Sequence, residues 1–168
     1  MCNALGRGTQ SVILRKGGIA EGRRGFSFRY REFFLFPTLF HEQVEKVRIA
    51  STDIPAPNNT IAIRWYAKVE QALRIDSFEI AEALAPLHIL SAGVVWERFG
   101  YKGDGLNVAF VRVFEISPVW VLQNEKRFGG CRSWTGLPPP PEMEMRPVLD
   151  DTAHAKLRAQ LDRILSSS

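Results

Sequence analysis

The chain has 168 residues, of which 45% are hydrophobic and 24% charged, a composition that suits a single globular domain with a buried core. The longest apolar runs, over 33–36 and 87–96, fall well short of the ~20 residues of a membrane-spanning helix, and the first residues lack the apolar run of a signal peptide. Cys2 and Cys131 are the only cysteines, which excludes a disulfide framework. We therefore expect a cytoplasmic protein without a membrane segment.

The net charge of +4 is unevenly distributed along the chain. Residues 1–50 hold nine Lys/Arg against four Asp/Glu, whereas residues 51–168 hold thirteen against fourteen. Because the whole basic excess lies in the first third, the sequence favours an anionic partner such as a nucleic acid or a nucleotide. A solvated basic edge would explain the same excess equally well.

The first half of the chain predicts strands followed by a helix. Residues 10–15 are short and β-branched, which is typical of a buried strand. The alternation over 26–30 predicts a half-buried strand that pairs in antiparallel fashion with a second strand over 33–36. Thr38 can cap a helix that reaches about Arg48, and the proline-rich and asparagine-rich stretch over 51–60 predicts a loop.

The second half mixes strands and helices without a regular strand–helix–strand rhythm. The expected elements are one long or two short strands over 61–75, a helix from an Asp76 cap to about residue 85, a helix over 92–99 after Ser91, and strands over 106–116 and 119–122. A stiff proline-rich connector over 137–147 then leads to a C-terminal helix over 150–165, capped by Asp150 or Asp151. In this helix one apolar stripe contains Leu157, Leu161, Ile164 and Leu165. These elements predict one α+β domain over residues 1–168, with a mainly antiparallel or mixed sheet and three to four helices.

Several short motifs resemble a bacterial family of unknown function, the domain-of-unknown-function family 1802. They are Leu14-Arg15-Lys16-Gly17-Gly18-Ile19, Phe34-Leu35-Phe36-Pro37-Thr38, His41-Glu42-Gln43, Arg98-Phe99, Arg112-Val113-Phe114, Gly130-Cys131-Arg132-Ser133-Trp134 and Pro147-Val148-Leu149. The resemblance covers nearly the whole chain and implies no activity. Family members usually open with a segment that contains Lys-Glu-Trp, so the resemblance implies either that translation starts upstream or that a first strand or helix is missing, and the missing element would leave an unpaired strand edge beside residues 12–14.

The most suggestive polar cluster is Arg15-Lys16-Gly17-Gly18. Two cations followed by two glycines let backbone N–H groups approach an anion while the side chains neutralise it. The Gly-x-x-x-x-Gly-Lys-Ser/Thr pattern of nucleotide hydrolases is absent from the sequence. A solvated strand end with a tight glycine turn is the alternative.

Two histidines are candidates for chemistry or binding. His41, with Gln43 nearby, lies in the first turn of the helix predicted over 38–48, where the helix dipole favours a neutral imidazole that can act as a general base. His88 lies in an apolar run, so we expect a core histidine there more than a ligand contact. The spacing of the three histidines does not form a metal-ligand pair, and the sequence predicts no metal site and names no cofactor.

Two later segments supply the remaining candidates. Arg98, beside aromatic residues, can stack on a base or bind a phosphate. Cys131 follows two glycines and precedes Arg132, which makes it a candidate nucleophile, although free cysteines are commonly small buried hydrophobes. Arg132 and Trp134 are better candidates for a ligand clamp.

The sequence therefore leaves three functions open. The first is binding of an anionic ligand, nucleic acid or nucleotide, in a basic cleft formed by Arg15, Lys16, His41, Arg98 and Arg132. The second is a hydrolase with His41 as general base and Cys131 or water as nucleophile. The third is a protein-interaction module that uses the proline run over 138–141, with no identified partner.

Overall fold

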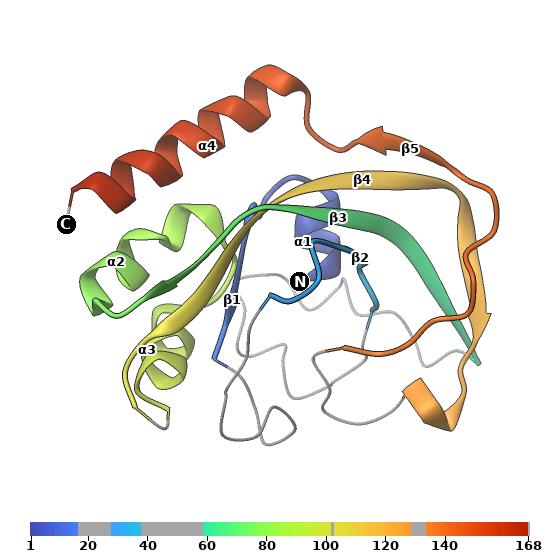
Figure 1. The fold of residues 1–168 in the computed structure, drawn as a ribbon, viewed down its shortest axis with the longest axis horizontal. Helices are drawn as coiled ribbons and strands as arrows, with labels where there is room; N and C mark the ends of the chain where they lie inside the picture. Colours follow the sequence, from blue (N-terminus) through green and yellow to red (C-terminus); the bar gives the residue numbers. More distant parts are fainter. Residues whose placement is uncertain (17–27, 38–58, 102, 129–133, 168) are drawn as a thin grey trace.

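The computed structural model describes residues 1–16, 28–37, 59–101, 103–128 and 134–167. Within these ranges it contains four α-helices and one five-stranded antiparallel sheet, so the predicted α+β class is confirmed (Figure 1). The elements are α1 (Cys2–Gly6), β1 (Val12–Arg15), β2 (Glu32–Phe34), β3 (Thr60–Ile75), α2 (Phe78–Ala83), the 3-10 turn η4 (Ala85–Leu87), α3 (Ala92–Gly100), β4 (Leu106–Gln123), the 3-10 turn η5 (Lys126–Phe128), β5 (Glu144–Pro147) and α4 (Asp151–Ser166). The helix predicted over 38–48 lies outside the described residues.

Two long antiparallel strands, β3 and β4, form the centre of the sheet. Their pairing shifts register between Ile63 and Trp65 and again between Val69 and Gln71. Such irregularities bend a strand and increase its twist. Both strands accordingly arch across the molecule, as Figure 1 shows. The stretch over 61–75 is therefore one continuous strand, and the two strands predicted over 106–116 and 119–122 are joined in β4.

The strand order is β1-β4-β3-β2, and β5 pairs with β4 farther along the strand than β1 does. The predicted pairing of residues 26–30 with 33–36 is wrong for the described part, because 28–30 form no strand and β2 pairs with β3. In that pairing Phe33 lies opposite Ala67 and Phe34 opposite Tyr66, and the two phenylalanines pack in two different apolar clusters. A long curved strand offers more burial than an isolated hairpin does.

Helices α2, α3 and α4 cover one face of the sheet. Figure 1 shows α4 above the arch of β3 and β4. Helices α2 and α3 lie at the end of the arch where β3 ends and β4 begins, whereas α1 and β2 lie below the arch. Val12, Leu14 and Phe110 point from the sheet into this helical layer and are almost completely buried there. Leu161 of α4 has no exposed surface and joins the same cluster, which confirms the apolar stripe expected in the last helix. Within the described residues no helix has both the length and the apolar composition needed to cross a membrane.

The helix caps match the sequence only in part. Asp150 caps α4 by accepting a hydrogen bond from the N–H of Ala153 at 2.7 Å, as predicted. For α2 the predicted Asp76 cap is wrong, since the hydroxyl of Ser77 accepts from the N–H of Ile80 at 3.3 Å. Asp76 instead pairs with Arg74. The connector predicted over 137–147 ends in strand β5, because its last four residues pair with β4.

The opposite face of the sheet carries a second apolar cluster. It includes Leu5 of α1, Ile13 of β1 and Leu35, packed on alanine and valine side chains of β3 and β4. Gly6 lies directly against the ring of Trp65, so that a β-carbon at this position would overlap the indole. The close approach of α1 to β3 therefore requires glycine at residue 6.

Candidate anion-binding site

Lys16 lies at the end of β1, where it fastens this strand to the turn between α3 and β4. Its ammonium group donates hydrogen bonds to the carbonyl oxygens of Phe99 and Gly105, both at 2.7 Å, and to that of Gly103. An ammonium group has three donors, and all three are used here. Burial lowers the pKa of Lys16, and the positive charge of Arg74 lowers it further. Lys16 contributes its charge to the site, while its hydrogen bonds hold the turn.

The turn that receives Lys16 is shaped by glycine and closed by Arg74. Gly103 and Gly105 have φ angles of 100° and 110°, which residues with a β-carbon rarely adopt. The guanidinium of Arg74 donates to Asp76 at 2.8 Å and to the carbonyl oxygen of Asp104 at 2.5 Å. Negative charge is therefore present beside Lys16, on the side of the turn.

Arg98 comes from α3 and meets the same strand end. Its Nη1 donates to the carbonyl oxygen of Leu14 at 3.4 Å, a long hydrogen bond to the residue before Arg15. Burial lowers the pKa of Arg98, and the positive charge of Arg15 lowers it further, with Glu97 acting in the opposite direction. Two guanidinium groups thus lie within electrostatic reach of each other at the end of β1. We call Arg15, Lys16 and Arg98 the β1-end cation cluster.

Trp134 lies at the other edge of the sheet, on aromatic side chains of the β2 segment. Its ring meets those of Tyr30 and Phe33 edge to face, at centroid distances of 4.9 Å and 5.1 Å. The guanidinium carbon of Arg29 lies 5.1 Å from the centre of the Tyr30 ring. Trp134 is therefore part of an aromatic group with a cation beside it, separate from the β1-end cation cluster.

His88 is an interior residue with only 4% of its surface exposed. Its Nδ1 accepts a hydrogen bond from the backbone N–H of Leu90 at 3.1 Å, just after the turn η4. This environment favours the structural role that the apolar sequence context predicted. A ligand contact of His88 stays a prediction.

The remaining predicted site residues lie outside the described residues. They are Gly17, Gly18, His41, Gln43, Cys131 and Arg132. The proximity of His41 and Cys131, on which the nucleophile version of the hydrolase depends, stays a prediction for this reason. In the part of the chain that the structure describes, no three His, Cys, Asp or Glu side chains gather as a metal site would require.

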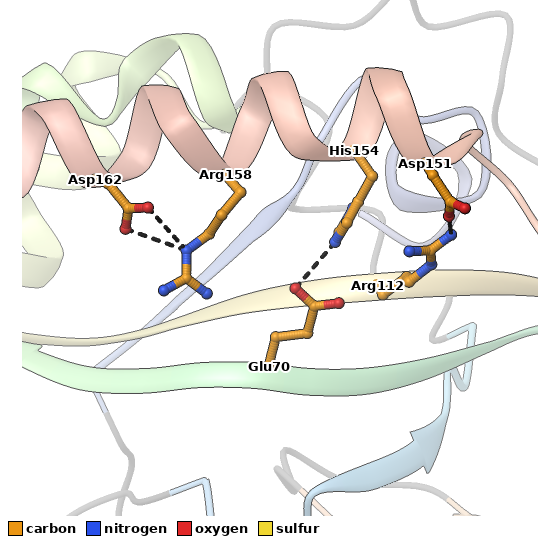
Figure 2. Close-up of polar contacts among 6 residues, drawn as sticks. All are labelled: Glu70, Arg112, Asp151, His154, Arg158 and Asp162. Atoms are coloured by element: carbon orange, nitrogen blue, oxygen red, sulfur yellow. Dashed lines mark hydrogen bonds and ion pairs between the residues drawn. The ribbon is translucent and has the colours of Figure 1, made fainter.

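Sequence reasoning missed a polar layer between α4 and the sheet (Figure 2). His154 of α4, with 7% of its surface exposed, lies with its Nε2 3.0 Å from a carboxylate oxygen of Glu70 on β3. One turn earlier in α4, Asp151 accepts a hydrogen bond from Arg112 of β4. We call these four residues the α4 polar layer. One signal was present, because His154 precedes Leu157 and Leu161 by three and seven residues and so lies on the buried stripe of the helix.

The α4 polar layer has little room for a substrate. A cavity of about 10 Å³ adjoins it, lined among others by Gln10, Ser11 and His154. A single water molecule needs roughly that volume. The layer therefore serves the packing of α4, and the half-buried cations at the end of β1 are the better candidate for ligand contact.

The chain matches the family model described as "Domain of unknown function (DUF1802)" over residues 1–160. The searches of curated proteins and of solved structures gave no match. Because the matched segment spans nearly all of the 168 residues, the resemblance seen in the sequence motifs is confirmed. This chain belongs to the DUF1802 family.

Proposed function

We propose that this protein binds an anionic ligand, a nucleic acid or a nucleotide, through the β1-end cation cluster. The observation that carries the proposal is the approach of Arg98 to the end of β1, where its Nη1 donates to the carbonyl oxygen of Leu14, the residue before Arg15, at 3.4 Å. Each guanidinium disfavours the charge of the other, and the lowered pKa of Arg98 reflects both this repulsion and its burial. A phosphate group between them would offset the repulsion and accept hydrogen bonds from both planar donor groups.

Lys16 strengthens this field without using its own donors on the ligand. Lys16 follows Arg15 in the chain, and its ammonium group is fixed by hydrogen bonds to the carbonyl groups of Phe99, Gly103 and Gly105. A fixed charge adds to the attraction for an anion and costs no reordering when the anion binds. The cytoplasmic location expected from the sequence would supply nucleic acids and nucleotides as ligands.

The test is equilibrium binding of labelled RNA and DNA oligonucleotides, measured by fluorescence anisotropy at several salt concentrations. We expect binding at low salt, with log K falling as log salt rises by about 0.7–0.9 for each phosphate contact. Arg15→Ala should weaken binding and reduce this slope by about one contact. Arg98→Lys keeps the charge but removes the planar fork, so it should also weaken binding.

Arg163→Ala is the matched control, since it removes the same charge from α4, where the Arg163 side chain donates to the carbonyl oxygen of Ala159. Each variant is first compared with the parent in thermal unfolding, so that loss of fold is not mistaken for loss of binding. Absence of RNA and DNA binding at low salt would overturn the proposal. Equal losses in Arg15→Ala and Arg163→Ala would overturn the assignment of the site.

A further inference from the structure

The outer face of α3 presents a tryptophan to solvent. Trp96 has 66% of its surface exposed, the largest fraction among the large apolar side chains in the described part of the chain. Its ring meets that of Phe78 in α2 edge to face, at a centroid distance of 4.7 Å. Figure 1 shows α2 and α3 next to one another, at the end of the sheet away from β5. The indole is therefore supported by α2 and still accessible to a partner.

Helix α3 leaves room beside this ring. Gly93 and Gly100 lie three residues before and four residues after Trp96, and so on the same side of the helix. Both are exposed, and the position that a β-carbon would occupy is open at each of them. Val95 and Phe99 face the core instead. A segment of another protein can therefore approach the indole without displacing a side chain of α3.

The segment that contains Trp96 is acidic in a chain that is basic as a whole. Residues 75–97 hold four carboxylates and no Lys or Arg, whereas the net charge of the chain is +4. Two of these carboxylates lie beside arginines. Asp76 pairs with Arg74, and Glu79 lines a hollow between α2 and α4 together with Arg163.

The other two carboxylates, Glu82 and Glu97, flank the aromatic pair. Glu82 lies one helical turn beyond Phe78 in α2, and Glu97 follows Trp96 in α3. Both are exposed, and neither forms an ion pair with a described residue. We call Phe78, Glu82, Trp96 and Glu97 the α2–α3 acidic surface.

This surface is separate from the β1-end cation cluster. Arg98 extends from α3 to the carbonyl oxygen of Leu14 at the end of β1, whereas Trp96 extends towards α2. Two residues of an α-helix are roughly 200° apart around its axis, so the two side chains leave α3 in different directions. A ligand of the cation cluster and a ligand of the α2–α3 acidic surface would therefore contact different sides of α3.

We propose that the α2–α3 acidic surface binds a basic segment of a partner protein, which places an arginine on the indole of Trp96 and further cations beside Glu82 and Glu97. Charge complementarity favours this occupant, because carboxylates around an exposed ring repel a nucleic acid or an acidic protein. A guanidinium over an indole is attracted by the negative face of the ring. Trp and Arg are also enriched among the residues that dominate the energy of protein interfaces.

The experiment measures binding of a labelled peptide of alternating arginine and alanine to the full chain, by fluorescence anisotropy at low salt. Trp96→Ala should weaken binding about 2- to 30-fold, the range expected for one cation–π contact. Trp96→Leu keeps apolar volume without an aromatic face and should weaken binding as much. The same peptide with citrulline in place of arginine keeps the planar groups without their charge, and it should bind the parent and Trp96→Ala equally weakly. Tyr30→Ala is the matched control, because it removes a ring that is 48% exposed at the β2 edge, and it should retain the parent affinity.

Glu82→Gln tests the carboxylates without changing side-chain size. It should weaken binding of the arginine peptide about 1.5- to 5-fold, and added salt should reduce this difference. Glu142→Gln removes an exposed carboxylate outside α2 and α3 and should retain the parent affinity. Thermal unfolding of each variant is compared with that of the parent, so that loss of fold is not mistaken for loss of binding.

Four results would overturn the proposal. The first is absence of binding of the arginine peptide to the parent at low salt. The second is an affinity of Trp96→Ala or Trp96→Leu equal to that of the parent. The third is an equal loss in Glu82→Gln and Glu142→Gln, because the peptide would then bind acidic charge in general. The fourth is sedimentation of the parent as a dimer and of Trp96→Ala as a monomer, because a second copy of the chain would then cover the surface.

Discussion

Two groups of charged side chains in the described residues are arranged in opposite ways. In the α4 polar layer Arg112 meets Asp151 and His154 meets Glu70, so each basic group faces a carboxylate (Figure 2). In the β1-end cation cluster, Arg15 lies near Arg98 and neutral carbonyls hold Lys16. The first arrangement neutralises charge within the protein. The second brings two guanidinium groups within electrostatic reach of each other, with Glu97 acting on Arg98 in the opposite direction.

The largest expected effect is on the free energy of unfolding, and it tests whether α4 packs on the sheet at the α4 polar layer. Leu161 has no exposed surface and packs among the helices and the sheet. Leu161→Ala should lower the free energy of unfolding by about 2–5 kcal/mol, measured by urea denaturation, because it removes buried apolar volume and leaves a cavity. Arg163→Ala, in an exposed position of the same helix, should change it by less than about 0.5 kcal/mol. If Leu161→Ala lowered the free energy of unfolding by no more than Arg163→Ala does, α4 would not pack as described.

A smaller effect distinguishes the members of the cation cluster from one another. Lys16→Met retains most of the side-chain volume but removes three hydrogen bonds from a charged donor to backbone carbonyls. We expect it to lower the free energy of unfolding by about 2 kcal/mol. Arg15→Ala should weaken anion binding. If Lys16→Met is as stable as the parent, the hydrogen bonds of Lys16 do not hold the turn. Lys16 would then be a candidate for direct contact with the ligand.

Local sequence patterns predicted most elements of the fold, since they depend on neighbours in the chain. The buried strand at residues 12–15, the Asp150 cap and the stripe that contains Leu161 all follow from periodicity and capping chemistry. Pairing was harder to predict. Nothing local shows that Phe33 and Phe34 pack on β3, or that residues 144–147 pair with β4, because each contact joins segments distant in the chain.

The sequence predicted which residues form the candidate site, but it did not predict what each of them does there. Arg15 and Arg98 were named from the sequence, and the structure places Arg98 against the carbonyl oxygen of Leu14, the residue before Arg15. The engagement of Lys16 depends on carbonyl groups that a turn more than eighty residues away presents, which no motif encodes. Glu70 was missed because its importance follows from the docking of α4 above it, at a register shift in β3.

The smallest expected effect concerns the exposed ion pair at the start of α4. The hydrogen bond and positive charge of Arg112 lower the pKa of Asp151, and His154 acts in the same direction. A carboxyl group with a lowered pKa in the folded state stabilises the fold above its unfolded pKa of about 3.9, and this contribution is lost as the pH falls through the folded value. The stability difference between the parent and Asp151→Asn should therefore be full near neutral pH and disappear in acid.

Arg112→Gln provides the matched background for this measurement, because it removes the partner and leaves the carboxyl group in place. In that background Asp151→Asn should have little pH-dependent effect on the free energy of unfolding. A pH dependence of the same size with and without Arg112 would mean that the α4 dipole alone acts on Asp151. The contrast between the α4 polar layer, in which opposite charges meet, and the β1-end cation cluster would then depend on His154 and Glu70 alone.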